Sequence, residues 1–184
     1  MGTPERSADR ILVEQFRAGD REAFTVLYRN HSRAVYRFVF YMTGDPVRAG
    51  EITQDVFVWL VHHPDGFDPQ RGELGAFLVG VARKMLKRRY SEEHRWVPIE
   101  ESMRAPESGA EDSYDTELLR QAIRALPARY REVVVLCDLE SRSYEEAAAI
   151  ANCAVGTVRS RLHRARALLA RKLARNSMGR GCAV

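Results

Sequence analysis

The stretch from Ser143 to Arg166, SYEEAAAIANCAVGTVRSRLHRAR, opens acidic and rich in alanine and then carries arginine at almost every other position. Ser143 and Glu146 have the spacing of a capping box, which predicts that a helix begins here. The triplet Asn152-Cys153-Ala154 predicts a tight turn in which asparagine takes the left-handed backbone conformation. A second helix is expected to start near Val155. Two short helices joined by a three-residue turn make a helix-turn-helix.

The second of these helices has an apolar face and a basic face. At about 100° per residue, six aliphatic or small side chains share one side and are expected to be buried: Val155, Val158, Leu162, Ala165, Leu169 and Leu173. The opposite face, with Arg159 at its edge, consists of Ser160, His163, Arg164, Ala167 and Arg171. A merely solvated face usually mixes both charge signs, but residues 156–169 hold four arginines and no acid. This pattern favours a helix that reads the major groove, with Arg161 and Arg166 at its flanks for phosphates.

The charge is distributed unevenly along the 184 residues, whose net charge is only +4. Residues 83–95 hold six lysines and arginines against two glutamates, and residues 154–175 hold seven against no acid. Between them, residues 100–117 carry seven acids and one arginine. Two basic segments on either side of an acidic one predict two contact sites for nucleic acid.

Apolar residues recur at spacings of three and four along most of the chain, which predicts an all-α protein. The three consecutive valines at 133–135 are strand-like by themselves, but the spacing around them favours a helix. The periodicity is lost between about residues 92 and 115, where prolines, serines and acids predict a flexible linker. We therefore expect two small helical domains, 1–91 and 116–176, joined by the linker 92–115 and followed by a tail, 177–184.

Local signals mark the ends of several helices in the first domain. Gly19 and Gly44 are expected to close the first two helices, because glycine is favoured just after a helix C-terminus. Asp20 is a plausible N-cap for the second helix. The pair Asp45-Pro46 predicts the start of the third, since proline is tolerated at the first helical position.

The composition argues against several other classes of protein. Cys137, Cys153 and Cys182 form no CxxC pair, so neither a disulfide framework nor a zinc site is expected, and a reducing cytosol fits. No apolar run approaches a membrane span, and the N-terminus MGTPERSADR lacks a signal-peptide core. His62-His63 is placed at a helix end with no nucleophile or metal-ligand spacing around it. We expect no enzyme activity, no catalytic residue, no metal and no cofactor.

With these residues in view, the chain resembles an extracytoplasmic-function (ECF) sigma factor of the sigma-70 family, a subunit of bacterial RNA polymerase. ALPARYREVVVLCDLESRSYEEAAAIANCAVGTVRSRLHRARALL resembles region 4 of that family. DREAFTVLYRNHSRAVYRFVFYMTGDPVRAGEITQDVFVWLV is similar to regions 2.1 and 2.2, and FDPQRGELGAFLVGVARKMLKRR to regions 2.3 and 2.4. The acidic linker stands where primary sigma factors carry a region 3, which this class lacks.

The resemblance implies three sets of contact residues. The segment that docks on the clamp helices of the polymerase β′ subunit contains Thr53, Gln54, Asp55, Phe57 and Trp59. The loop and helix that open the −10 element and hold a flipped base contain Phe67, Arg71, Phe77, Lys84, Lys87 and Arg88. The helix that reads the −35 element contains Thr157, Arg159, Ser160, Arg161, His163, Arg164 and Arg171. A basic ridge beside aromatic surface suits an unstacked strand, whereas the alternative for Phe57 and Trp59 is that both rings fill the local core.

The partners implied are core RNA polymerase, through its β′ clamp helices and β flap, promoter DNA and an anti-sigma factor. The chain has no sensor domain, so control is expected from outside, in the bacterial cytoplasm. The alternative is a stand-alone helix-turn-helix transcriptional regulator whose N-terminal helices dimerise or bind an effector. A polar and aromatic docking segment followed by a basic aromatic one favours the sigma factor, because a regulator would need a self-complementary face or an effector pocket.

Overall fold

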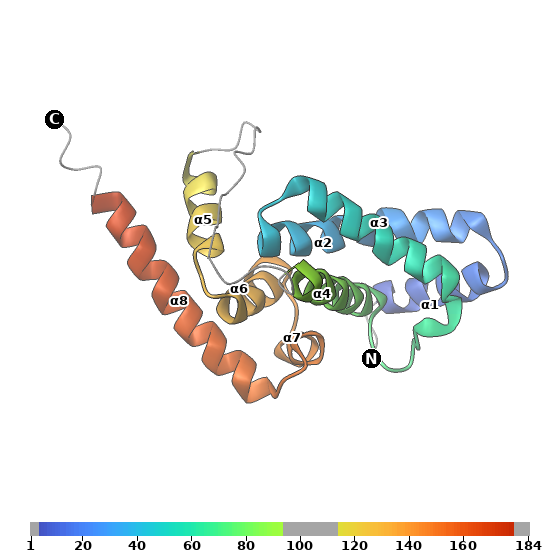
Figure 1. The fold of residues 1–184 in the computed structure, drawn as a ribbon. Coiled ribbons are helices and arrows are strands. Elements are labelled where there is room, and N and C mark those ends of the chain that lie inside the picture. The colour runs from blue at the N-terminus through green and yellow to red at the C-terminus, as the bar shows by residue number, and fades with distance from the viewer. Residues whose placement is uncertain (1–3, 94–113, 179–184) are drawn as a thin grey trace. The chain divides into compact units, whose positions relative to one another are not determined.

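The computed structural model describes residues 4–93 and 114–178, and within these ranges all regular structure is helical (Figure 1). The contacts divide the chain into two compact units. The first contains α1, α3, α4 and most of α2, and the second contains α5 to α8. The predicted linker and tail, together with Cys182, lie largely outside the described residues. The all-helical fold that the sequence predicts is confirmed.

The first unit consists of α1 (Pro4–Arg17), α2 (Arg21–Thr43), α3 (Pro46–His62), a short 3₁₀ turn η1 (Pro64–Gly66) and α4 (Leu74–Glu93). The carboxylate of Asp20 accepts hydrogen bonds from the backbone N–H groups of Glu22 (2.8 Å) and Ala23 (3.3 Å), so the predicted N-cap of α2 is confirmed. Gly19 and Gly44, with φ of +95° and +77°, end α1 and α2 in a conformation that favours glycine.

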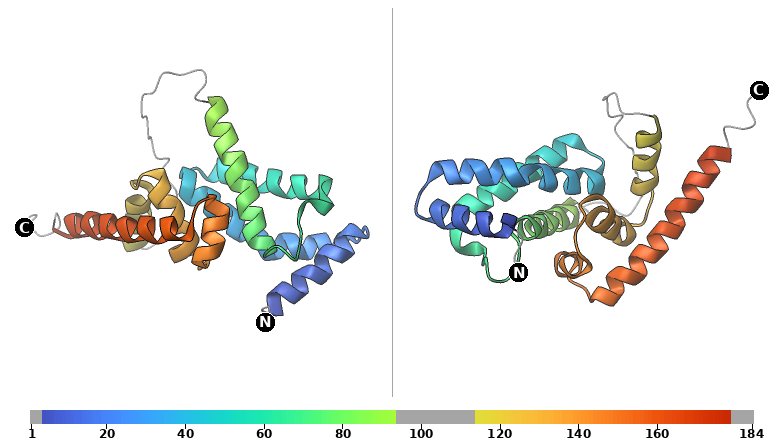
Figure 2. Two further views of the ribbon diagram at one scale, coloured as in Figure 1. Left: turned by 90° about the horizontal axis from the view of Figure 1, so that it is seen from below. Right: turned by 180° about the vertical axis from the view of Figure 1, so that it is seen from behind.

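Aromatic and aliphatic side chains hold these helices together. α4 packs against α3 (Figure 2), and α2 contacts α3 through aromatic side chains. The ring of Phe57 on α3 lies against Phe24 and Tyr28 of α2, at 6.3 and 4.8 Å between centroids. His31 on α2 is 3.0 Å from the carboxylate of Asp9 on α1. The fully buried side chains include Leu27, Val35, Phe38, Val39, Ile52, Leu60, Leu74 and Leu78.

The second unit consists of α5 (Tyr114–Arg124), α6 (Ala128–Val134), a π-helical turn η2 (Val135–Leu139), α7 (Tyr144–Ala151) and α8 (Val155–Met178). The helices α5, α6 and α7 all contact α8, which is the long C-terminal helix in Figure 1. The three valines at 133–135 are helical, as their spacing predicts, and their side chains are buried. Other core residues of this unit are Ile123, Leu126, Leu136, Val158, Leu162 and Ala165.

The helix-turn-helix is formed by α7 and α8, and its local signals act as the sequence predicts. The hydroxyl of Ser143 accepts from the backbone N–H of Glu146 (3.1 Å), and the Glu146 carboxylate accepts from the backbone N–H of Ser143 (2.9 Å). The capping box is therefore complete. Asn152, with φ of +50°, takes the left-handed conformation and ends α7. The backbone N–H of Cys153 then donates to the carbonyl of Ala148 (3.0 Å), so two local motifs fix the turn.

Candidate nucleic-acid and polymerase interfaces

The two faces of α8 are divided as its sequence predicts. Val158, Leu162 and Ala165 are fully buried. The exposed residues include five of the predicted −35 contacts, which are Arg159, Ser160, His163, Arg164 and Arg171. The other two, Thr157 and Arg161, are half-buried. The unit therefore presents a polar and basic helix face, on which no acidic residue is present.

Aromatic rings of the neighbouring helices support two of these arginines. The guanidinium of Arg159 lies 5.8 Å from the ring centroid of Tyr144 on α7. Arg164 hydrogen-bonds the hydroxyl of Tyr130 on α6, and this bond lowers the pKa of that hydroxyl. Each ring restricts the positions open to a long, flexible side chain, so less conformational entropy remains to be lost when a ligand binds.

The arginines at the flanks each have a partner within the unit. Arg166 makes two hydrogen bonds to the carboxylate of Asp138, at 3.2 and 2.6 Å, and this pairing raises the pKa of the guanidinium. Arg161 lies 3.9 Å from the sulfur of Cys153 in the turn. Asp138 already neutralises Arg166, which was expected to face phosphates, and nothing in the sequence around Arg166 indicates this pair. The exposed basic face is consequently narrower than the arginine run implies.

In the predicted polymerase-docking segment of α3, neighbouring residues differ in exposure. Gln54 is exposed, and Asp55 is half-exposed. Thr53 is only 5% exposed and donates its hydroxyl to the carbonyl of Ala49 (2.7 Å). Its side chain therefore faces the core and satisfies the helix backbone, and its contact with a partner stays a prediction.

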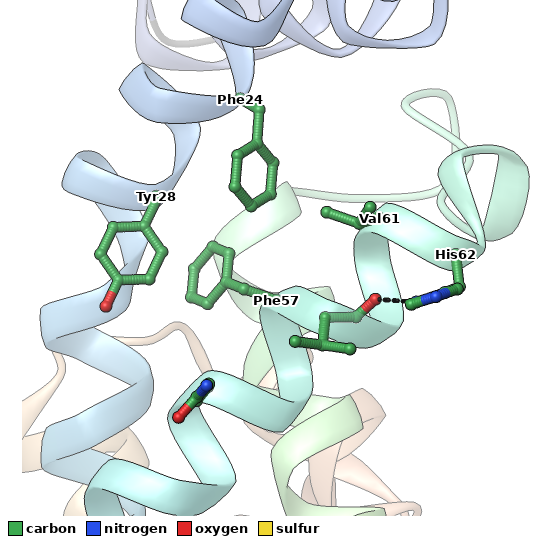
Figure 3. Close-up of a pocket in the computed structure, with 7 residues that line it drawn as sticks. Phe24, Tyr28, Phe57, Val61 and His62 are labelled. Atoms are coloured by element: carbon green, nitrogen blue, oxygen red, sulfur yellow. Dashed lines mark hydrogen bonds between the residues drawn. The ribbon is translucent and has the colours of Figure 1, made fainter.

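Beside Gln54, an apolar hollow opens between α2 and α3 (Figure 3). It is lined by Phe24, Tyr28, Gln54, Phe57, Val58, Val61 and His62. Phe57 is 2% exposed and forms part of the wall, so the ring belongs to the core rather than projecting as an anchor. Tyr28, Val58 and Val61 are each 43–46% exposed. An open apolar surface of this kind suits a protein partner.

Val58 and Val61 are absent from the residues predicted above, although the sequence carries a signal for them. Both residues fall off the stripe of Ile52, Val56 and Leu60 that faces the core of the unit. Apolar side chains off the buried stripe of an amphipathic helix need another reason to be there. In this chain they border the hollow.

Asp55 and a second acid, Glu51, share one basic partner on α4. Arg89 donates to the carboxylates of Asp55 (2.5 Å) and Glu51 (3.1 Å). The side chain of Arg89 is 35% exposed and that of Asp55 is 47% exposed, so the group sits at the surface. This bridge joins the predicted docking helix to the predicted DNA-contacting helix within the same unit.

Trp59 lies with the predicted −10 residues rather than with the docking residues. Its ring stacks on His63 at 4.7 Å between centroids and 11° between planes, and lies 5.8 Å from the ring of Phe77 on α4. A second hollow is lined by Trp59, His62, His63, Pro64, Asp65, Gly66, Phe77, Val81, Lys84, Met85 and Arg88. An aromatic wall and cationic side chains therefore meet at one surface of the first unit.

The other predicted −10 residues divide into buried and exposed ones. Phe67 is 4% exposed and packs on Phe77 at 5.2 Å, so its ring lies in the core of the unit, and its contact with a base stays a prediction. Arg71 is exposed in the loop before α4, and Phe77 is half-buried. Lys84, Lys87 and Arg88 are exposed at spacings of three and four, which places them on one face of α4. Arg88 also pairs with Glu92 at 2.8 Å, which raises the pKa of Arg88.

Three further features concern metals, thiols and membranes. Among the described residues, no group of three or more His, Cys, Asp or Glu side chains is placed to hold a metal ion. Cys137 and Cys153 are free thiols, and burial, with a smaller effect from Asp138, raises the pKa of Cys137 to about 11. Of the helices in 4–93 and 114–178, none is both long and apolar enough to cross a membrane.

A helix-turn-helix with a basic, acid-free outer face defines a DNA-binding class of protein. Comparison with known families narrows this class. The family model described as Sigma-70 region 2 matches residues 27–96, and that described as Sigma-70, region 4 matches residues 116–169.

Individual relatives agree with these matches. The ECF RNA polymerase sigma factor SigE of Mycolicibacterium smegmatis is 34% identical over 82% of this chain, which spans 62% of that protein's length. The ECF RNA polymerase sigma-E factor of Escherichia coli is 31% identical over 92% of this chain and 96% of its own length. The sigma factor RpoE of Bartonella quintana, solved in complex with the anti-sigma factor NepR, superposes with a TM-score of 0.71 at 27% identity, covering 82% of this chain and 96% of that one. The chain belongs to the ECF sigma factors of the sigma-70 family.

Proposed function

We propose that this protein is a promoter-specificity subunit that binds core RNA polymerase and directs DNA-templated transcription initiation. In this proposal α8 reads the −35 element, and the surface around Trp59 and α4 opens the −10 element. The first unit docks on the clamp helices of β′ and the second on the β flap. The protein acts in the bacterial cytoplasm and carries no catalytic group of its own, because the polymerase performs the chemistry.

The observation that carries the proposal is the outer face of α8. Arg159 and Arg164 lie in the half of the helix next to the turn, where a recognition helix comes nearest to base edges. Both are exposed, and each is supported by a tyrosine. Ser160, a small residue between the arginines, donates its hydroxyl to the carbonyl of Thr157 (3.0 Å), so its side chain lies along the helix and does not project from this face. A face built in this way allows guanidinium groups to reach guanine without steric obstruction.

The second hollow of the first unit supports the −10 role. Stacking on aromatic rings is tolerant of sequence, and cations along one edge follow the phosphate backbone. Trp59 and Phe77 offer the rings, and Lys84 and Arg88 offer the cations. Lys87 and Arg71 extend the basic surface on either side. This assignment moves Trp59 from the docking set to the DNA-contacting set.

We also propose that an anti-sigma factor controls this protein through the apolar hollow between α2 and α3. The relative from Bartonella quintana was solved with such a partner. A hollow bordered by exposed Tyr28, Val58 and Val61 beside polar Gln54 offers an apolar centre with a polar rim. If the polymerase uses the same surface, a single inhibitor prevents docking. Val61→Glu should then weaken both interactions.

Run-off transcription tests the main proposal. Core polymerase is combined with the purified protein and a DNA library randomised at two hexamers whose centres lie about 21 base pairs apart. This spacing is two helical turns and places both elements on one face of the duplex. The transcripts are then sequenced. We expect transcripts only when core and this protein are both present, with base preferences at both hexamers. A stand-alone regulator would instead bind DNA without core and yield no transcript. That result would refute the proposal.

A further inference from the structure

Arg17, the last residue of α1, reaches the loop that connects α3 to α4. Its Nε donates to the carbonyl of Pro64 (3.0 Å), and its Nη2 donates to the carbonyl of Phe67 (2.5 Å). The same Nε lies 3.3 Å from the carboxylate of Asp65. One guanidinium therefore binds both ends of the 3₁₀ turn η1, from a helix that is 47 residues away in sequence.

The turn also contacts the end of α3. Within it, the backbone N–H of Gly66 donates to the carbonyl of His63 (2.9 Å). The turn lies so close to Trp59 that a Cβ on Gly66 would be 2.6 Å from the indole ring. Trp59, His63 and Gly66 line the second hollow, so any shift of the turn changes the wall of that hollow.

The two hydrogen bonds to backbone carbonyls, rather than the ion pair with Asp65, hold the turn in place. The carboxylate of Asp65 is 90% exposed, and water and salt screen a pair at such a position. Arg17 is 28% exposed, and its bond to Phe67 is partly buried. A rigid guanidinium fork can donate to two acceptors at once, which a single ammonium on a flexible stem does less well.

We propose that Arg17 is a positioning residue for the −10 element: by holding the carbonyls of Pro64 and Phe67 it sets the shape of the wall that meets the unstacked strand. This proposal rests on the −10 assignment made above for the second hollow. Arg17 lies outside residues 27–96, to which the region 2 family model extends, so that match does not assign it a role.

The test uses full-length variants with core polymerase and the promoter library randomised at both hexamers. Arg17→Ala removes the fork, and Arg17→Gln retains part of the stem but cannot reach both carbonyls. Asp65→Asn removes only the ion pair. Arg10→Ala is the matched control, because Arg10 is an exposed arginine on the same helix and its loss changes the net charge equally.

We expect both Arg17 variants to change preference at one or more −10 positions by about tenfold, which is the effect of losing one charge-assisted hydrogen bond. Their −35 preference and their affinity for core should stay within about twofold of wild type, and Arg10→Ala should retain the wild-type −10 profile. Asp65→Asn alters one residue of the hollow's wall and should change the −10 profile less than Arg17→Ala does. A uniform loss over all −10 sequences, or an unchanged profile, would overturn the proposal. An Asp65→Asn profile equal to that of Arg17→Ala would also overturn it, since the ion pair would then be responsible. If the wild-type protein shows −35 preference but none at −10, the −10 assignment fails together with this proposal.

Discussion

Asp55 offers a sharp test of polymerase docking, because the structure gives it a second role inside the chain. Its carboxylate pairs with Arg89 of α4, which also binds Glu51. Asp55→Arg therefore does two things. It reverses a charge at the proposed interface, and it replaces an intramolecular attraction with a repulsion. The magnitudes of the two effects differ enough to separate them.

The intramolecular effect is small. Both partners are at least one-third exposed, and ion pairs at such sites contribute about 0–1 kcal/mol. The new repulsion between two guanidinium groups adds about 1 kcal/mol in a largely aqueous setting. The free energy of unfolding should therefore fall by no more than about 2 kcal/mol. At a complementary interface, like charges cost several kcal/mol, and 3 kcal/mol corresponds to a factor of roughly 150 in Kd.

The assay measures binding of labelled protein to core polymerase by fluorescence anisotropy, with urea unfolding followed by circular dichroism as the stability control. Three variants are compared: Asp55→Arg, Arg89→Asp and the double charge swap. The swap restores the intramolecular pair but leaves the wrong charge at position 55. We expect the swap to recover stability and to remain defective in binding. If the swap regains wild-type affinity, Asp55 acts only within the chain, and the docking assignment is wrong.

Three further predictions concern the second unit. Ser143→Ala removes the side-chain half of the capping box and should lower the free energy of unfolding by about 1 kcal/mol in urea titrations; an unchanged midpoint would show that α7 does not depend on its cap. Arg164→Ala should cost about 1–3 kcal/mol on the preferred −35 element and relax preference at one or two bases, whereas Arg171→Ala should weaken all promoters about equally and reduce the salt dependence, as −35 library transcription at several salt concentrations would show. If both variants lose activity uniformly, α8 is only an electrostatic anchor. Cys137 has a pKa of about 11 in the folded protein against an ordinary 9.0, so at pH 9 iodoacetamide should modify it about fifty times more slowly than in urea, with the other two cysteines replaced by serine. Equal rates would contradict the burial of this thiol.

The features that could best be predicted from the sequence are those that depend only on residues nearby in the chain. The capping box at Ser143, the left-handed Asn152 and the N-cap Asp20 each need only a few residues to form. The buried stripe of α8 was also predictable, because helix geometry alone brings Val158, Leu162 and the next aliphatic positions to one side. Such local features allow the fold class to be predicted before any tertiary contact is known.

Features that depend on distant contacts were not predictable in this way. Helix α3 contacts α2 on one side and α4 on another, so Phe57 and Trp59, two residues apart, enter different environments. A resemblance to one docking segment cannot separate them. The same limit explains Thr53 and Phe67, whose burial follows from the packing of the whole unit. The bond from Arg17 to the 3₁₀ turn spans 47 residues and leaves no pattern in the sequence.

The basic character of the two proposed DNA surfaces depends more on where the cations lie than on how many there are. Arg166 and Arg89 belong to the arginine-rich segments, yet acids from other helices neutralise each of them. A nucleic-acid surface built from every arginine in the sequence would bind any duplex strongly, because phosphate contacts dominate affinity and carry no sequence information. Pairing Arg166 with Asp138 leaves Arg159 and Arg164 as the prominent cations near the turn of α8, each supported by a tyrosine. If α8 reads DNA as proposed, pairing of this kind lowers non-specific affinity while the proposed base-reading groups stay in position, and it favours specificity over strength of binding.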